Sequence, residues 1–247
     1  MQILKKLTVL TIFLTISNSF SQDYFFKDKN PFDSRIPTPE EFLGYPIGDQ
    51  HTRHDQIVSY LYKLAEISDK AEIEVYGYTH ERRKLVILRV SSEDNLADLN
   101  EIKKQHLKFV DPSLSPTNYD AIPVFIQLAY NVHGNEPSSS EAALLTAYTL
   151  VASESEEVKN YLNNSVIFID PTINPDGRDR HTQWANQYKA YSLVSDNADA
   201  EHNEMWPRGR TNHYWFDLNR DWLLAVHPES QGKLKWYHNW YPNVVTD

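Results

Sequence analysis

An uninterrupted apolar run that leads into a polar loop and then a helical pattern is the feature that most restricts the fold of this chain. The run extends from Val124 to Tyr130, and its length and composition are typical of a strand buried on both faces. Ser138-x-x-Glu141 then matches a capping box at the start of an amphipathic helix. A second buried strand is predicted at 166–169. Because such strands need helices on both sides, these segments predict a layered α/β domain.

The other periodic segments fit the same architecture. Apolar residues at helical spacing predict a helix over 54–67, and short alternating runs predict strands over 72–76 and 85–90. The aromatic residues Trp236, Tyr237, Trp240 and Tyr241 are interpreted as core packing on one short helix. We therefore predict a three-layer α/β/α fold with a mixed sheet over 49–247. Residues 22–48 lack a clear period and are interpreted as an extended leader.

The first 21 residues have the organisation of a signal peptide. Lys5 and Lys6 precede an apolar run from Leu7 to Ile16, and Ser19-Phe20-Ser21 supplies small residues for cleavage after Ser21. The run of ten residues is shorter than the roughly 20 needed to span a bilayer. We therefore expect a secreted or periplasmic protein without a stable membrane anchor after cleavage, whose formal charge changes from −10 to −12 because two lysines are removed.

Composition excludes several classes of site. The chain has no cysteine, so a metal ion must be held by histidine, aspartate or glutamate, and ten histidines are present. A charge of −10 disfavours nucleic acid as a partner, since phosphate binding calls for clustered basic residues. The seven glycines form neither a nucleotide-binding loop nor a nucleophile elbow.

His133-Gly134-Asn135-Glu136 lies between the first buried strand and the helix that follows it. Loops at the carboxyl ends of strands are where ligands bind in open α/β sheets, and imidazole and carboxylate are both zinc ligands. We expect Gly134 to permit the turn that brings the two side chains together. Alone, the motif has a simpler interpretation, in which Glu136 only favours the helix N-terminus and His133 ends the strand.

Two further motifs follow. Asn174-Pro175-Asp176-Gly177 has the composition of a turn. Asp217-Leu218-Asn219-Arg220-Asp221 places a guanidinium beside an amide, which could bind a carboxylate through two parallel hydrogen bonds or form an internal ion pair with one of its neighbouring aspartates. His80-Glu81-Arg82-Arg83 is interpreted as a solvated hairpin tip.

Together, H-x-x-E, N-P-D-G and D-L-N-R in this order resemble the zinc carboxypeptidases of the metallopeptidase M14 family, over roughly His51 to Asp247. The resemblance implies one Zn²⁺ ion, with His133 and Glu136 as its first two ligands, and Asn219 and Arg220 as the pair that binds the terminal carboxylate of the substrate. It also implies an arginine that polarises the scissile carbonyl. Arg210 is favoured for this role over Arg208 and Arg180.

The family pattern also contains a third zinc ligand, a histidine at the end of the next strand, and a catalytic glutamate further on. We expect both beyond Asp247, so the chain is interpreted as truncated and the fragment alone as inactive. His227 is the other candidate ligand, but Pro228-Glu229-Ser230 after it has the pattern of a helix start. The resemblance implies that Pro228 to Trp240 form the helix that follows the Asn219-Arg220 pair in the family, and that the next strand begins near Asn243.

The function implied by the resemblance is that of a secreted zinc metallocarboxypeptidase that hydrolyses C-terminal bonds of peptides or proteins. Zinc held by three protein ligands makes hydroxide available near neutral pH. Two alternatives remain open at this point. One is a zinc amidase or deacylase on the same fold, and the other is a non-catalytic secreted binding module with a vestigial site.

Overall fold

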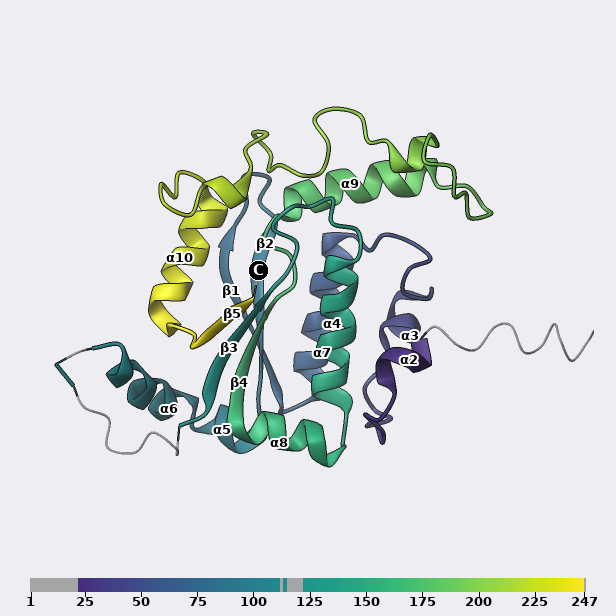
Figure 1. Ribbon diagram of the computed structural model, residues 1–247. Helices are drawn as coiled ribbons and strands as arrows, with labels where there is room; N and C mark the ends of the chain where they lie inside the picture. Colours follow the sequence, from purple (N-terminus) through teal and green to yellow (C-terminus); the bar gives the residue numbers. More distant parts are fainter. Residues whose placement is uncertain (1–21, 112, 115–121, 247) are drawn as a thin grey trace, which may run out of the picture.

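The computed structural model describes residues 22–111, 113–114 and 122–246, so the signal peptide predicted at 1–21 lies outside the described residues. Figure 1 shows how the strands and helices are arranged. The strands are β1 (Ala71–Tyr78), β2 (Lys84–Val90), β3 (Val124–Ala129), β4 (Ser165–Asp170) and β5 (Val244–Thr246). The helices are α2 (Gln22–Phe26), α3 (Pro39–Leu43), α4 (His54–Ile67), α5 (Glu93–Ala97), α6 (Leu99–His106), α7 (Ser139–Ala152), α8 (Glu156–Asn164), α9 (Pro175–Tyr188) and α10 (Pro228–Trp240), with short 3₁₀ turns at Leu107–Phe109, Ala200–His202 and Leu218–Arg220.

The five described strands form one mixed sheet in the order β1-β2-β4-β3-β5. β1 and β2 are an antiparallel hairpin, and β2 pairs antiparallel with β4. β3 pairs in parallel with β4 on one side and with β5 on the other. Because β3 and β4 run in the same direction, the loops that follow these two strands leave the sheet at the same end.

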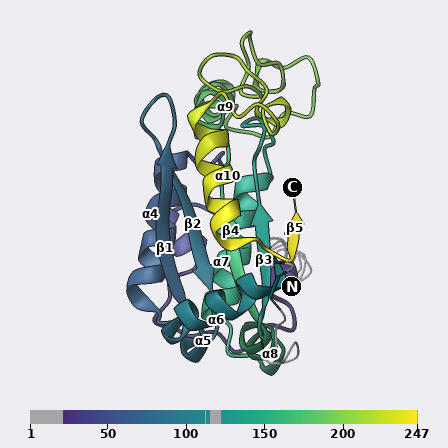
Figure 2. The ribbon, with the colours of Figure 1, turned by 90° about the vertical axis from the view of Figure 1, so that its left-hand side faces the viewer.

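Helices cover both faces of the sheet, which confirms the predicted three-layer α/β/α fold (Figures 1 and 2). Alternate residues of β4 show the division. Ile167 and Ile169 pack with the α4 and α7 side of the core, whereas Val166 and Phe168 pack with Trp236 and Trp240 of α10 and with leucines of α5 and α6 on the other side. All six residues of β4 are buried, as expected of a strand between two helical layers.

The predicted helices 54–67 and 228–240 have the observed bounds of α4 and α10. The predicted capping box at α7 is wrong in detail, because Ser138 occupies the N-cap position but its side chain forms no capping hydrogen bond. Glu141 instead points inward, where the Arg178 guanidinium donates to its carboxylate (Nη2–Oε1 2.7 Å). A buried ion pair thus replaces the local cap.

Two other segments differ from expectation. Asn174-Pro175-Asp176-Gly177 is the start of α9 rather than an isolated turn, because the Asn174 side chain accepts a hydrogen bond from the Gly177 amide and Pro175 occupies the first turn. Residues 22–48 are not extended throughout, since they contain α2 and α3. Phe26, Phe32 and Phe42 of this segment pack against the core on the α4–α7 side.

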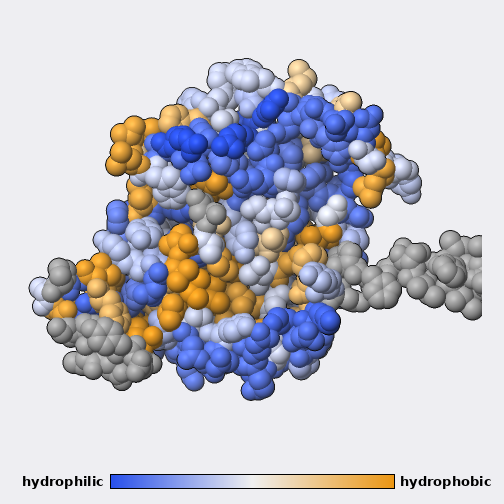
Figure 3. Space-filling model, in the orientation of Figure 1, coloured by the Kyte–Doolittle hydropathy of each residue, from blue (hydrophilic) through white to orange (hydrophobic). Residues whose placement is uncertain are grey.

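The β5 side of the sheet carries apolar surface. Val244 and Val245 of this edge strand are exposed, and Figure 3 shows apolar surface in this part of the molecule, below a hydrophilic region over α9 and the neighbouring loops. Among the described residues, none of the helices is both long enough and apolar enough to cross a membrane.

Candidate metal and substrate site

Asn131 shapes the loop between β3 and α7. Its φ of 60° lies in the left-handed region that asparagine tolerates, and its backbone amide donates to Ser139 Oγ. Its side-chain amide donates to two carbonyls, those of His133 (2.9 Å) and Glu136 (3.1 Å). One side chain therefore connects both ends of the H-x-x-E segment and holds them on the same side of the loop.

His133 lies between two carboxylates. Its Nδ1 is 2.8 Å from Glu136 Oε1, and its Nε2 is 3.0 Å from Asp217 Oδ1. The imidazole is buried, whereas Glu136 is partly exposed. The structure thus brings the two predicted ligands together and adds Asp217, which sequence analysis treated only as a possible ion-pair partner of an arginine.

Two glycines allow the H-x-x-E loop, the start of α9 and the loop at Gly209 to pack closely against one another. A Cβ on Gly134 would lie 2.0 Å from the carbonyl carbon of Gly177 and 2.1 Å from the amide nitrogen of Arg178. A Cβ on Gly177 would lie 2.4 Å from the carbonyl oxygen of Gly209. Neither glycine has a positive φ, so the expectation that Gly134 is needed for its turn geometry is wrong. Close approach of one backbone to another is the reason for both.

Asp217 receives hydrogen bonds from three groups. Arg210 Nη2 donates to Oδ2 (2.9 Å), and the Asn219 amide donates to Oδ1 (3.0 Å), which also faces His133. Burial acts to raise the pKa of Asp217, but these hydrogen bonds together lower it below its usual value. The carboxylate is therefore held in its charged form next to the imidazole.

The three candidate arginines lie in different surroundings. Only Arg210 is ion-paired with Asp217, beside His133. Arg180 donates to the backbone carbonyls of Arg208, Thr211 and Asn212, which fixes its guanidinium to a loop. Arg208 is exposed. Of the three, Arg210 alone has a described contact with Asp217, whose other carboxylate oxygen faces His133.

Asn219 and Arg220 lie on a 3₁₀ turn that Asp217 caps. The Asn219 carboxamide oxygen accepts from Trp222 Nε1 (3.1 Å), and Arg220 Nη1 donates to the Asn219 carbonyl (3.0 Å). Neither neighbouring aspartate forms an ion pair with Arg220 within the described part of the chain, so the internal ion pair considered for it is not observed. The Arg220 side chain is exposed.

Comparison with known proteins identifies the family. The family model of the zinc carboxypeptidases, Peptidase M14, matches residues 57–241. The chain belongs to the zinc carboxypeptidase family. It is 29% identical over 198 residues to carboxypeptidase E of Caenorhabditis elegans, an alignment that covers 74% of this chain and 34% of that protein.

Solved carboxypeptidase structures share the fold. A carboxypeptidase A from Shewanella denitrificans superposes with a TM-score of 0.51 at 15% identity, covering 78% of this chain and 38% of the other. Thrombin-activatable fibrinolysis inhibitor superposes with a TM-score of 0.50 at 14% identity, covering 85% of this chain and 50% of the other. This zinc carboxypeptidase chain therefore spans between a third and a half of the length of these relatives.

The residues present fit zinc. His133 Nδ1 and Glu136 Oε1 are donor atoms of the two types that zinc prefers apart from thiolates, and they already face each other. The second nitrogen of a metal-binding histidine is commonly hydrogen-bonded to a carboxylate, which fixes the tautomer and the ring orientation. Asp217 occupies that position. The H-x-x-E loop, completed by Asp217, is called the loop site below.

Arg178 contacts the backbone of the loop site, and sequence analysis did not identify it. It is fully buried, and besides its pair with Glu141 it donates to the carbonyls of Glu136 and Pro137 and to that of Thr52. Its position one residue after N-P-D-G was a local signal, but a buried arginine cannot be distinguished from an exposed one without the long-range partner.

A cavity of about 590 Å³ lies beside the loop site and is lined in part by Asn135, His51, His181 and Glu204. Glu204 accepts from Asn135 (2.8 Å) and pairs with His181 (2.6 Å). Burial, followed by the nearby His181 and Arg178, lowers the pKa of His51 to about 4. His181 thus has a carboxylate partner that its sequence context did not reveal.

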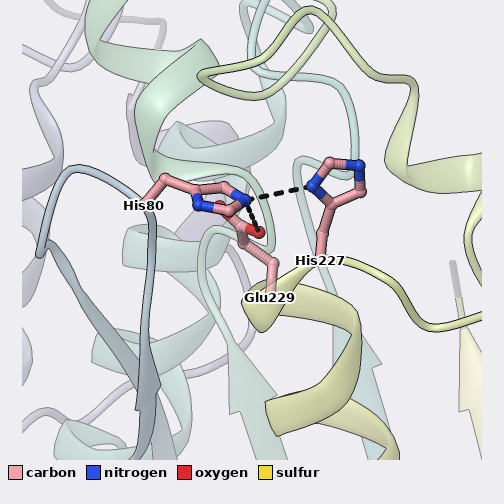
Figure 4. A group of neighbouring side chains, drawn as sticks. All are labelled: His80, His227 and Glu229. Carbon is pink, nitrogen blue, oxygen red and sulfur yellow. Dashed lines mark hydrogen bonds and ion pairs between the residues drawn. The ribbon is translucent and has the colours of Figure 1, made fainter.

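A second group of histidine and glutamate lies at the tip of the β1–β2 hairpin. His80 Nε2 is 3.0 Å from His227 Nδ1 and 4.0 Å from Glu229 Oε2 (Figure 4). Burial is the main cause that raises the pKa of Glu229 to about 7, and burial next to His227 lowers the pKa of His80. These three residues are called the hairpin cluster below.

The interpretation of the hairpin tip as merely solvated is wrong. Arg83 pairs with Asp176 (2.8 Å) and Asp179 (2.6 Å) of α9, and Thr79 Oγ1 also donates to Asp176. The tip is therefore attached to the N-terminal turn of α9. His213 pairs with Glu81 of the tip (2.9 Å).

Proposed function

We propose that the protein is a secreted or periplasmic zinc carboxypeptidase that removes residues from the C-termini of peptides or proteins. The observation that carries the proposal is the loop site, in which His133 and Glu136 present donor atoms 2.8 Å apart and Asp217 orients the imidazole. Family membership supports peptide hydrolysis with zinc. The N-terminal segment, with its signal-peptide composition, supports export.

His133 and Glu136 would hold the zinc ion, which when bound supplies a Lewis acid for a peptide carbonyl and activates water near neutral pH. A third protein ligand would approach from the direction of β5. β5 runs parallel to β3 with Thr246 opposite Leu128, so the carboxyl end of β5 lies at the same end of the sheet as the loop that contains His133. A cavity lined by both Glu136 and Thr246 connects the two positions.

Arg220 is proposed to bind the terminal carboxylate of the substrate. Its exposed guanidinium forms no ion pair within the described residues, and the neighbouring Asn219 backbone is fixed by Asp217. A guanidinium can donate two parallel hydrogen bonds to a carboxylate. Recognition of this group would place the last peptide bond of the substrate at the loop site and so limit cleavage to chain ends.

Arg210 is proposed to stabilise negative charge on the carbonyl oxygen of the scissile bond. It is exposed and lies beside Asp217, so its remaining N–H donors are available to a substrate. Removal of one such donor in other enzymes reduces kcat about 10²–10³-fold. We expect Arg210→Met to have an effect of this size in the full-length protein, whereas Arg208→Met leaves kcat within about two-fold. An equal loss in both variants would contradict the assignment.

The test of the substrate class compares peptides with free and amidated C-termini as substrates of the zinc-loaded full-length protein. We expect cleavage of the free form and a large loss on amidation, and Arg220→Gln should abolish the difference by lowering activity on the free form. The matched control is Arg35→Gln, an exposed arginine that pairs locally with Asp33. Equal cleavage of both substrates would assign the chain to amide hydrolysis without recognition of a terminal carboxylate.

A further inference from the structure

The hairpin cluster joins two segments that are distant in the sequence. His80 lies in the turn between β1 and β2, His227 is the N-cap residue of α10, and Glu229 lies in the first turn of that helix. Figure 4 shows all three side chains converging on one point between the turn and the helix. Neither His133 nor Glu136 forms a hydrogen bond or ion pair with these residues in the described part of the chain.

The donor atoms of the cluster lie at distances suited to a shared ion. One imidazole nitrogen from each histidine and one carboxylate oxygen are all within 4.8 Å of one another. His80 Nε2 and His227 Nδ1 are 3.0 Å apart. Two nitrogens bound at about 2.0–2.1 Å to one tetrahedral zinc ion are separated by about 3.3–3.4 Å, so a small outward movement of the two rings makes room for it.

The surroundings of Glu229 provide a second, independent observation. The residue is 1% exposed, and among the described residues no group donates a hydrogen bond of normal distance and angle to either oxygen of its carboxylate. The His80 backbone and the Asn212 side chain lie near enough only to lower its pKa, against the larger effect of burial. Burial of a carboxylate without a partner is costly, and such groups are normally paired or bound to a metal ion. Asp176, buried nearby, shows the usual arrangement, because Thr79 and Arg83 both donate to it.

We propose that His80, His227 and Glu229 bind a second divalent cation of the zinc type. Two imidazole nitrogens and one carboxylate oxygen form a ligand set that suits Zn²⁺ better than Ca²⁺ or Mg²⁺, which prefer oxygen ligands alone. Three protein ligands leave a fourth position for water. The cation would neutralise the carboxylate of Glu229 and would connect the hairpin tip to the start of α10.

Binding at this site would compete with two existing contacts of His227 Nδ1, one with His80 Nε2 and one with Asn212 Nδ2. Asn212 Nδ2 lies 3.0 Å from His227 Nδ1, and its Oδ1 accepts from the amides of Tyr214 and Phe216. A cation on His227 Nδ1 therefore releases the Asn212 amide group but leaves its contacts with the 214–216 backbone. The cost is the loss of the two contacts of His227 Nδ1, with His80 and with Asn212, which the metal–ligand bonds replace.

The test counts metal ions in the full-length protein after removal of metal with a chelator and titration with Zn²⁺. Relative to the wild type, His133→Ala and His80→Asn should each lower the count by one ion per chain, and the double variant should lower it by two. His213→Asn is the matched control, because this histidine lies next to His80 but pairs with Glu81. An unchanged count in His80→Asn, with the loop site filled, would overturn the proposal.

A second readout distinguishes a lost ligand from lost folding. In the His133→Ala background, Zn²⁺ at 100 times its Kd should raise the free energy of unfolding by about 2.7 kcal/mol, and Glu229→Gln should remove this increment. Circular dichroism checks that each variant is folded. If Zn²⁺ stabilises Glu229→Gln as much as its parent, the three residues form only a hydrogen-bonded cluster. Peptidase activity does not enter either measurement, so the outcome is independent of the proposed function.

Discussion

The loop site and the hairpin cluster use the same kinds of side chain but are assembled differently. The loop site takes its two donors from positions 133 and 136, and one asparagine holds both. The hairpin cluster takes His80 and His227 from positions 147 residues apart. The loop site also contains a carboxylate, that of Asp217, which receives several hydrogen bonds, whereas no described residue donates a well-formed hydrogen bond to the carboxylate of Glu229. A local motif is thus supported by its surroundings, and a long-range cluster depends on the fold.

The largest expected effect comes from removing Arg178, whose guanidinium pairs with Glu141 and contacts the backbone of the loop site. Arg178→Met should destabilise the protein by about 3–5 kcal/mol, because it leaves the carboxylate of Glu141 buried without its partner. Urea unfolding measures the effect. Arg35→Met, which breaks an exposed ion pair, should cost at most about 1 kcal/mol. Similar losses in both variants would show that the buried pair has no special role.

The second test addresses the contact between glycine backbones. Gly134→Ala should cost about 3 kcal/mol or more, because the added methyl group meets backbone atoms at 2.0–2.1 Å that cannot move independently. Gly232→Ala, in α10 near the hairpin cluster, should change stability by no more than about 1 kcal/mol, since its nearest contact is a Tyr76 side-chain atom at 3.3 Å. Denaturant titration measures the free energy of unfolding of both variants. A larger loss in Gly232→Ala than in Gly134→Ala would contradict the explanation.

The third test separates the two sites through two aspartates four residues apart. Asp217 orients His133, whereas Asp221 accepts from the amides of Val226 and His227 (2.9 and 3.0 Å) and so positions α10's N-cap. Asp217→Asn should weaken zinc binding at the loop site about 10–100-fold and leave the hairpin cluster unchanged. Asp221→Asn should have the opposite pattern. Zinc competition assays in the His80→Asn and His133→Ala backgrounds measure each site alone.

The smallest expected effect is a pH dependence beside the loop site. Burial lowers the pKa of His51 from 6.5 to about 4, so the folded protein holds this imidazole neutral while the unfolded chain binds a proton below about pH 6.5. Its contribution to stability is therefore lost as the pH falls from 6.5 toward 4. His51→Gln should flatten the stability profile in this window. A profile identical to that of the wild type would show that His51 is solvated in the folded state.

The sequence by itself determined the layers of the fold and the local part of the site. Continuous apolar runs and helical periodicity are properties of neighbouring residues, so α4 and the strands β3 and β4 could be predicted from them. The same holds for His133 and Glu136, which one loop contains. The expectation that β3 is buried on both faces is only partly met, because its alternate residues are exposed or partly buried. The family could also be recognised from the sequence, because the order of three short motifs along the chain can be seen without knowing their contacts.

Only the tertiary structure decided how those motifs meet. The buried pair of Arg178 with Glu141 and the contact of Asp217 with His133 depend on partners that lie 37 and 84 residues away in the sequence. The hairpin cluster depends on the docking of α10 against β1. The physical reason is the same in each case. Burial and pairing are set by which surfaces come into contact, and a local pattern specifies the surface but not its partner.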